Sequence, residues 1–254
     1  MNSELLDRLR QSKKYRDVCP DTLRRIIAEC EGRYKGNKAL EKAVREKLHG
    51  ITSAFMSDAE YKRAQRLADE WSQGDDALEA LLCCHASTRE RLPLAAMDKL
   101  YRQIFEITGT PASLLDLACG INPAYLLARY PDMRVTGVDI SGQSINIISR
   151  CGGSAAQGDL LCENAVPAQR FDLALLFKIL PLLDRQRSGA AMDVLNAVNA
   201  AHIVVSFPTR TLGGRNVGME ENYSVWMEGH LPEKCEIAAK FATENEWFYI
   251  LKEK

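Results

Sequence analysis

The stretch LLDLACG at Leu114–Gly120, followed by VTGVDI at Val135–Ile140, decides the fold of this chain. Each piece is a short apolar run; the first stops at a turn of small residues, and the second ends next to an acid. This pattern predicts a parallel β-α-β unit whose first turn lets a ligand approach the backbone closely. Asp139, at the tip of the second strand, is then placed to accept hydrogen bonds from both hydroxyls of a ribose. The sequence therefore predicts a nucleoside-binding site.

The composition of the turn narrows the kind of nucleoside. A dinucleotide needs the pattern GxGxxG so that its pyrophosphate can sit on a helix N-terminus, but here the single Gly120 is followed by Ile121-Asn122-Pro123. A cofactor without phosphate, such as S-adenosylmethionine, needs only one tight turn beside its aminoacyl group, as Ala118 and Gly120 provide. Two alternatives stay open: an ordinary strand-to-helix turn, and Asp139 as the N-cap of a helix over 141–150.

The composition of the whole chain is that of a soluble globular protein. Its 254 residues suffice for a large buried core, and 46% hydrophobic and 26% charged residues are ordinary values. No apolar run approaches the roughly 18 residues that span a bilayer, and the start MNSE lacks a signal-peptide pattern. We therefore expect a cytoplasmic protein without membrane contact. The cysteines form no CxxC pair and have no histidine at metal spacing, so we expect reduced thiols and no metal site; they are Cys19, Cys30, Cys83, Cys84, Cys119, Cys151, Cys162 and Cys235.

The net charge of −1 hides an asymmetry along the chain. Residues 1–66 hold 16 Lys and Arg against 10 Asp and Glu, and the remainder holds 17 against 24. A basic segment attached to an acidic one indicates that the first segment faces a polyanion. Helix surfaces rich in Lys and Arg are the structural alternative.

The periodicity of apolar residues changes near residue 107, and we expect two domains, a helical one over 1–106 and a Rossmann-like one over 107–254. Apolar residues recur at helical spacing around Leu5–Leu9 and Leu23–Ile27, and further helices are predicted over 38–54, 58–73, 75–83 and 88–108. Short apolar runs then alternate with helix-length segments, which predicts a mostly parallel sheet covered on both faces. The expected strands are 113–118, 134–139, 154–157, 171–177, 201–206, and a closing antiparallel hairpin of 234–240 and 246–252.

Two further segments carry candidate ligand contacts. Asp159 follows the third predicted strand, where an acid would accept the adenine amino group, with the Leu160 amide near the ring edge. The segment between Asp139 and Asp159 is short, so we expect a trimmed helix there. In His85–Leu92, Ser87 or Thr88 can cap the following helix, and a guanidinium held there, from Arg91, could clamp a carboxylate.

The end of the fourth predicted strand, FKILP at Phe177–Pro181, excludes two chemistries. It lacks the Asp or Asn followed by Pro-Pro and an aromatic residue that is typical of exocyclic amine methylation. It also lacks the Cys nucleophile of pyrimidine C5 methylation. The acceptor is therefore expected to be a nucleophile that needs little activation. The loop Ser206–Arg215 follows the fifth strand, and its two arginines and Gly pair fit a nucleic-acid or substrate lid.

Taken together, these motifs resemble the aminoglycoside-resistance 16S rRNA (guanine-N7) methyltransferases, which modify guanine 1405 in the decoding site. The resemblance covers almost the whole chain. The blocks that carry it are Ser12–Arg16 with Cys19–Thr22, Leu48–Gly50, His85–Leu92, Asp116–Pro123, Phe177–Leu183 and Ser206–Arg215. It implies a class I S-adenosylmethionine-dependent methyltransferase fold, Rossmann-like with a mostly parallel seven-stranded sheet, and an α-helical N-terminal extension.

The resemblance also implies roles for individual residues. The cofactor is S-adenosylmethionine, giving S-adenosylhomocysteine, and its methionine end meets Arg91 and His85. The implied cofactor contacts are His85, Arg91, Ala118, Gly120, Asp139, Ile140, Asp159, Leu160 and Phe177. The basic front end would dock on 16S rRNA in the assembled 30S subunit as a monomer, through candidates Lys13, Lys14, Arg16, Arg45 and Arg63.

Guanine N7 carries a lone pair and no proton, so attack on a sulfonium methyl group needs no general base. Catalysis then reduces to in-line positioning and desolvation. In A-form RNA the N7 atom faces a deep groove that side chains cannot read, so we expect the base to be extruded. The candidates for holding it are Phe177, Lys178, Phe207, Arg210 and Arg215. Two alternatives stay open: a decoding-site adenine-N1 methyltransferase, and a non-catalytic rRNA-binding protein with a vestigial cofactor fold.

Overall fold

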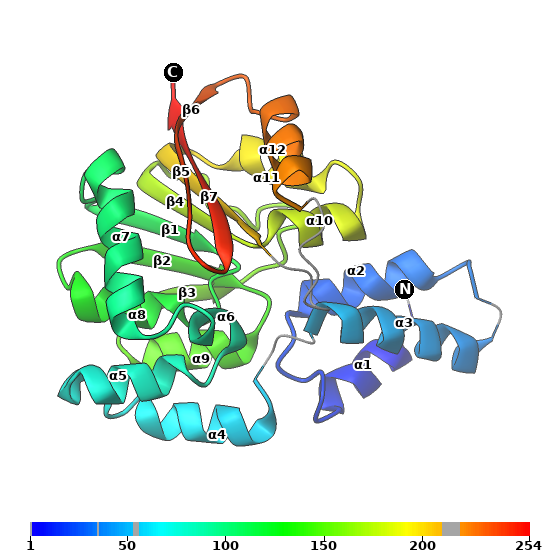
Figure 1. Ribbon diagram of the computed structural model, residues 1–254. Helices are drawn as coiled ribbons and strands as arrows, with labels where there is room; N and C mark the ends of the chain where they lie inside the picture. Colours follow the sequence, from blue (N-terminus) through cyan, green and yellow to red (C-terminus); the bar gives the residue numbers. More distant parts are fainter. Residues whose placement is uncertain (1, 35, 53–55, 210–218) are drawn as a thin grey trace.

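A single mixed β-sheet forms the centre of the computed structural model, which describes residues 2–34, 36–52, 56–209 and 219–254 (Figure 1). The strand order is β3-β2-β1-β4-β5-β7-β6, parallel from β3 to β5 and antiparallel at β5–β7 and β7–β6. The predicted strands and the closing hairpin are confirmed within two residues at each end. The bounds are β1 Ser113–Leu117, β2 Arg134–Asp139, β3 Ser154–Gln157, β4 Phe171–Phe177, β5 Ala200–Pro208, β6 Cys235–Ala242 and β7 Glu246–Glu253.

The helices follow the predicted pattern with two corrections. The single helix expected over 88–108 is two helices, because Pro93 has no backbone N–H and disfavours helical geometry at the residue before it. The helix expected over 58–73 ends at Leu67, and a short 3-10 helix follows. The bounds are α1 Ser3–Gln11, α2 Pro20–Cys30, α3 Asn37–Thr52, α4 Asp58–Leu67, η1 Trp71–Gln73, α5 Asp75–Leu82, α6 Ala86–Arg89, α7 Leu94–Thr108, α8 Asn122–Arg129, α9 Gly142–Arg150, α10 Leu180–Gln186, α11 Ala190–Ala197 and α12 Met219–Gly229.

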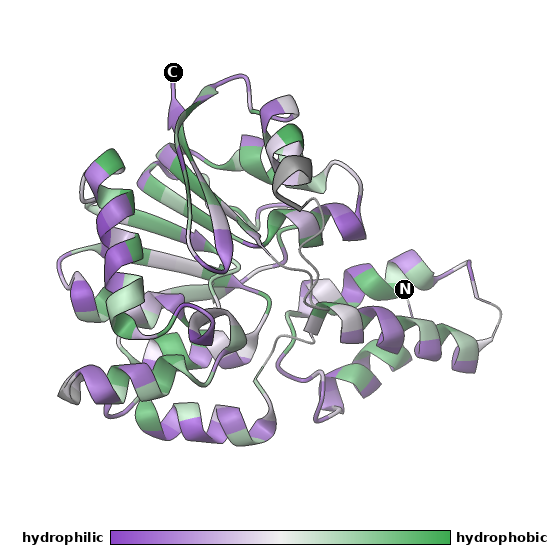
Figure 2. Ribbon diagram, in the orientation of Figure 1, coloured by the Kyte–Doolittle hydropathy of each residue, from purple (hydrophilic) through white to green (hydrophobic). Residues whose placement is uncertain are grey.

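Two hydrophobic cores cover the two faces of the sheet. Successive strand residues point to opposite faces, so Leu114 packs with α5, α7 and α8 whereas Leu115 packs with α10 and α11. Helix α4 adds the buried Ala64 and the partly buried Tyr61 and Leu67 to the first core, and Figure 2 colours most of its length hydrophilic. The central strands β1, β4 and β5 are thus buried on both faces, as their near-continuous apolar sequences predict, whereas the edge strands β3 and β6 are largely exposed.

A third core belongs to α1–α3 alone, which we call the N-terminal bundle (residues 3–52). It contains Leu9, Tyr15, Leu23 and Ile27 and shares no buried member with the two cores of the sheet. In Figure 1 these three helices stand to one side of the sheet. The cores therefore divide the chain between Thr52 and Met56. The boundary predicted from the sequence lies near 106. The two differ because α4–α7 are helical, like the N-terminal bundle, but pack on the sheet.

Candidate functional site

The candidate residues gather at the carboxyl edge of the parallel strands, where ligands bind in open α/β sheets. The strand order reverses between β1 and β4, so the turns after Leu117 and Phe177 lie side by side. Each turn contains a non-glycine residue in the left-handed region of backbone conformation: Ala118 has φ +56° and Lys178 has φ +57°. Such conformations cost free energy and occur mainly at functional sites. This pair of turns marks the centre of the site.

The turn after β1 is built around Gly120 and Asp139. Gly120 has φ +53°, and a Cβ there would lie 2.7 Å from Cε1 of His85. Its amide donates a 2.8 Å hydrogen bond to one carboxylate oxygen of Asp139, and the Ser141 amide donates at 2.8 Å to the other. The alternative in which Asp139 caps the next helix is wrong, because the Ser141 side chain caps α9.

Two buried carboxylates lie beneath this turn. Burial raises the pKa of Asp116 to about 7, although the Asn122 amide and Arg91 lower it. Burial also raises the pKa of Asp139, opposed by its backbone hydrogen bonds. Carboxyl groups desolvated in this way are stabilised in their charged form by a nearby cation. The site therefore suits a ligand that carries positive charge, as a sulfonium with an α-ammonium group does.

His85 is a cap and a neutral side chain. Its Nδ1 accepts from the Ser87 amide, so His85 caps α6, and the sequence was wrong to give this role to Ser87 or Thr88. The Thr88 hydroxyl instead donates to the carbonyls of Leu82 and His85. Burial, with the charges of Arg91 and Arg89, lowers the pKa of His85 from 6.5 to about 4. The His85 side chain is thus uncharged at neutral pH and packs against Gly120.

Arg91 has a partner that the sequence did not reveal. Its Nε and Nη2 donate to the two oxygens of Glu246 at 2.7 and 3.0 Å, and the side chains are 6% and 1% exposed. The guanidinium carbon also lies 4.6 Å from the ring centroid of Phe177. Nη1 makes no hydrogen bond with any residue that the structure describes. That nitrogen is the part of Arg91 left to bind a ligand carboxylate.

Glu246 also interacts with two neighbouring polar side chains. The Ser206 hydroxyl donates to it at 2.6 Å, and the ammonium of Lys178 lies 3.6 Å away. The same ammonium forms an ion pair with Glu90. Burial raises the pKa of Glu246, but the charges of Arg91 and Lys178 and the hydrogen bonds hold it below its usual value. Lys178 is therefore tied to two carboxylates beside the site.

The other four of the five residues expected to hold the target base, besides Lys178, differ in their surroundings. Phe177 is partly buried, and one face of its ring is covered by Arg91. The expectation that Phe207 stacks on a base is wrong for this structure, because Phe207 is 1% exposed and packs on Tyr223 in the core on the opposite face. Arg210 and Arg215 lie outside the described residues.

Asp159 is buried shortly after β3 and, like Arg91, forms an ion pair with a residue of a distant segment. One oxygen accepts from Nε of Arg25 at 3.0 Å and forms an ion pair with Nη2 at 2.9 Å, and the other accepts from the Leu161 amide at 3.0 Å. Arg25 belongs to α2 of the N-terminal bundle. Leu160 is buried beside Asp159, and the Ile140 carbonyl accepts from the Cys19 amide at 2.8 Å. The trimmed helix expected before Asp159 is confirmed, since α9 spans Gly142–Arg150.

The candidate RNA-binding residues lie outside the cofactor edge, four of them in the N-terminal bundle. Lys14 and Arg45 flank the buried Tyr15, with their cationic groups 5.4 and 5.6 Å from its ring centroid. They line a shallow groove of about 600 Å³ together with Lys38, Lys42, His49 and the acids Glu41 and Glu46. Lys13 and Arg16 are exposed nearby in the sequence, and Arg63 is exposed on α4.

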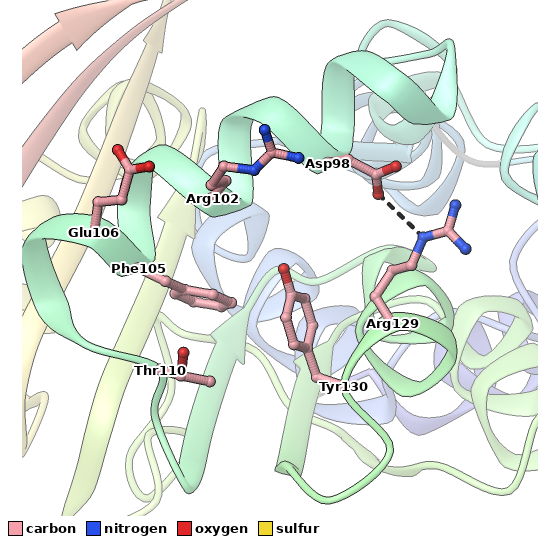
Figure 3. Close-up of a pocket in the computed structure, with 7 residues that line it drawn as sticks. All are labelled: Asp98, Arg102, Phe105, Glu106, Thr110, Arg129 and Tyr130. Atoms are coloured by element: carbon pink, nitrogen blue, oxygen red, sulfur yellow. Dashed lines mark hydrogen bonds and ion pairs between the residues drawn. The ribbon is translucent and has the colours of Figure 1, made fainter.

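A second cavity, of about 450 Å³, contains none of the candidate residues (Figure 3). Its walls come from α7, from Thr110 before β1 and from Tyr130 before β2, so it lies at the amino edge of the strands. All eight cysteines are free thiols, and the described residues contain no cluster of three His, Cys, Asp or Glu side chains that could hold a metal ion. Within the described segments, no helix has both the length and the apolarity needed to cross a lipid bilayer.

Comparison with known proteins agrees with this site. A family model described as ribosomal RNA methyltransferase (FmrO) matches residues 11–247. A 16S rRNA (guanine(1405)-N(7))-methyltransferase of Serratia marcescens is 44% identical over 256 residues, covering 98% of each chain. One of the same name from Proteus mirabilis is 32% identical and covers 98% of this chain and 96% of its own.

Two solved structures share the whole architecture. The 16S rRNA methyltransferase RmtF in complex with S-adenosyl-L-homocysteine is 40% identical, with a TM-score of 0.89 and coverage of 99% of this chain and 98% of its own. The 16S rRNA methylase RmtB is 37% identical, with a TM-score of 0.84 and the same coverage. The expected class I methyltransferase fold is confirmed, and the chain belongs to the FmrO family of ribosomal RNA methyltransferases.

Proposed function

We propose that this chain transfers a methyl group from S-adenosylmethionine to N7 of guanine 1405 in 16S rRNA. The observation that carries this proposal is the full-length similarity to relatives of that name, combined with a site at the strand-order reversal that suits a cationic nucleoside. The S-adenosylhomocysteine bound to RmtF supports the choice of cofactor.

The cofactor site has two halves. In the nucleoside half, Asp139 takes the ribose hydroxyls and Asp159 the adenine amino group, with Ile140 and Leu160 against the ring. In the methionine half, Nη1 of Arg91 binds the carboxylate, while Ala118, Gly120 and His85 shape the turn beside it. S-adenosylmethionine supplies an electrophilic methyl group. Because Glu246 neutralises one side of Arg91, the guanidinium stays oriented before the ligand arrives.

Methyl transfer to N7 needs no base, and the residues at the site fit that requirement. His85 is neutral, and the ammonium of Lys178 is held by carboxylates. The rate enhancement then comes from alignment of the extruded guanine and exclusion of water. We assign Phe177 and Lys178, on the turn facing Ala118, to guide the base, together with Arg210 and Arg215, which follow β5 in the sequence.

The substrate is expected to be the assembled 30S subunit in the cytoplasm, bound by a monomer of this chain. The basic N-terminal bundle supports this docking, since it folds around its own core and carries four of the five candidate cations. Lys13, Lys14, Arg16, Arg45 and Arg63 would contact phosphates of the rRNA, a sequence-independent interaction that salt weakens.

The test is methyl transfer from labelled S-adenosylmethionine to 30S subunits and to naked 16S rRNA, with the modified base mapped. We expect incorporation into 30S subunits and strand scission at guanine 1405 after reduction and aniline treatment. A direct reverse-transcriptase stop at an adenine would instead identify an adenine-N1 enzyme, and no incorporation would identify a non-catalytic binder. Expression in a susceptible bacterium should also raise its aminoglycoside resistance.

A further inference from the structure

The nucleoside half of the cofactor site is held by the N-terminal bundle as well as by the sheet. Val18 forms an isolated antiparallel bridge with Ser141, and the Cys19 amide donates to Ile140 O at 2.8 Å. In the other direction, the Gly142 amide donates to Asp17 O at 2.6 Å. These contacts fall on the residues that directly follow Asp139. The segment before α2 therefore acts as an added strand beside the ribose loop.

Arg25 makes the second connection, to the adenine loop. Its guanidinium is 14% exposed and reaches three elements: Asp159 after β3, Gln186 at the end of α10 at 2.9 Å, and Glu29 of its own helix at 2.8 Å. Asp159 itself is 4% exposed. A planar guanidinium with several fixed partners holds a carboxylate in one orientation better than a flexible ammonium does.

The hydrogen bonds of Asp159 leave one defined direction for a ligand. A carboxylate offers about four lone-pair positions, two on each oxygen. Oδ2 accepts from Nε of Arg25 and has Nη2 at 2.9 Å as an ion-pair partner, so the guanidinium occupies the side of Oδ2, and Oδ1 accepts from the Leu161 amide. Among the described residues, the remaining acceptor position is therefore on Oδ1. Without Arg25 the carboxylate could rotate, and this position would no longer be fixed.

We propose that Arg25 is a positioning residue that aims Asp159 at the exocyclic amino group of adenine, so that the bundle sets cofactor affinity and base selectivity. The inference rests on the proposed function, in which Asp159 accepts that amino group. It extends the function by giving the rRNA-docking bundle a part in cofactor recognition. By linkage, any change in this junction on binding the subunit changes cofactor affinity by the same factor as cofactor changes subunit affinity.

The test compares two ligands that differ at the group in question and in the proton on the adjacent ring nitrogen N1. S-adenosylhomocysteine carries the amino group, and S-inosylhomocysteine carries a carbonyl oxygen in its place, which Asp159 would repel. Calorimetry gives Kd for each ligand with wild type, Asp159→Asn, Arg25→Gln and Arg24→Gln. Arg24 is the matched control because it is exposed on the same helix and its ion pair among the described residues is with its helix neighbour Asp21.

We expect wild type and Arg24→Gln to prefer the adenine ligand equally. Arg25→Gln should bind S-adenosylhomocysteine roughly 10-fold more weakly, with little change for the inosine analogue, because one charge-assisted hydrogen bond loses its alignment. Gln186→Leu, which removes one partner of Arg25 but leaves the ion pair, should show the same trend at about 2-fold. A purely structural ion pair would lower the melting temperature and weaken both ligands alike.

The outcomes separate the two claims. If Asp159→Asn loses the preference while Arg25→Gln and Gln186→Leu keep the wild-type ratio, the positioning role is overturned and the role of Asp159 stands. If wild type shows no preference, the adenine role of Asp159 fails and the positioning role fails with it, while methylation of 30S subunits still tests the proposed activity separately.

Discussion

Two arginine–carboxylate pairs stand at the two ends of the proposed cofactor site, and they differ in what surrounds them. Arg91–Glu246 joins segments that pack on one sheet, and its side chains are 6% and 1% exposed. Arg25–Asp159 joins two bodies with separate hydrophobic cores and is slightly more open, at 14% and 4%. The first pair is therefore fixed by the packing of the sheet, and the second depends on how the N-terminal bundle is seated.

The junction around the second pair is also less complete in its hydrogen bonding. Thr22, Gln143 and Ser144 each have a buried side-chain atom without a hydrogen-bond partner among the described residues. Thr22 lies in the first turn of α2, shortly after Val18. Gln143 and Ser144 lie in the first turn of α9, shortly after Ser141, the residue that bridges to Val18. Each such atom costs about 1–3 kcal/mol relative to a satisfied one. The junction is thus a weaker contact than its number of polar groups suggests.

The largest expected difference comes from removing the carboxylate of each pair. Glu246→Gln leaves Arg91 buried without a counter-charge and should lower the free energy of unfolding by about 3–5 kcal/mol. Asp159→Asn should cost about 1–3 kcal/mol because Arg25 keeps Glu29 and Gln186. Urea denaturation measures both. Glu253→Gln, at an exposed ion pair with Arg170, serves as the control, and equal losses for both pairs would refute the contrast.

The pH dependence of stability tests whether His85 is neutral in the folded protein. The unfolded chain protonates His85 as the pH falls through 6.5, but the folded protein does so only near 4. The contribution of His85 to stability is therefore full above pH 6.5 and should fall by about 3 kcal/mol between pH 6.5 and 4, while Asp116, whose pKa is raised, contributes with the opposite sign over this range. The difference in unfolding free energy between wild type and His85→Gln should therefore show this slope, and the difference between wild type and His230→Gln, at an exposed histidine, should not. A difference that does not change with pH would mean that folding leaves the titration of His85 unshifted.

A smaller effect is expected at Ser206, which links the methionine half to the turn after β4. Its hydroxyl donates to Glu246 at 2.6 Å and accepts from the Lys178 amide at 3.1 Å. Ser206→Ala should cost about 1–2 kcal/mol and raise KM for S-adenosylmethionine, because Arg91 loses part of its support. Ser149→Ala, at an exposed position on α9, is the matched control. An unchanged KM would show that Glu246 orients Arg91 without this hydroxyl.

The smallest effect is expected from relieving strain at Ala118. An L-residue in the left-handed region costs roughly 1 kcal/mol that glycine does not. Ala118→Gly should therefore raise the free energy of unfolding by about 0.5–1 kcal/mol. Ala28→Gly, in the bundle helix α2, should lower it by a similar amount. A loss of stability at position 118 would show that the methyl group packs favourably there.

The elements of the site could be predicted from the sequence, but its partners could not. Strand ends and the small turn follow from local alternation, so Asp139 and Gly120 were found directly. Glu246 and Arg25 have no local signal, because each pairs with a residue on a distant segment. Phe207 was misassigned for a related reason: Phe177 lies opposite Ser206, so Phe207 points to the other face of the sheet. Only the register of β4 and β5 reveals this.

The pairing of Arg91 with Glu246 has a consequence for how the enzyme is made. The two residues are 155 positions apart, and Glu246 opens the last strand. A growing chain therefore carries Arg91 through most of its synthesis without the carboxylate that balances it. Domains of this kind fold from the N-terminus as they emerge, but here the methyl-donor site closes only when the final hairpin docks. A chain cut anywhere before β7 would keep most of its strands and lose its function.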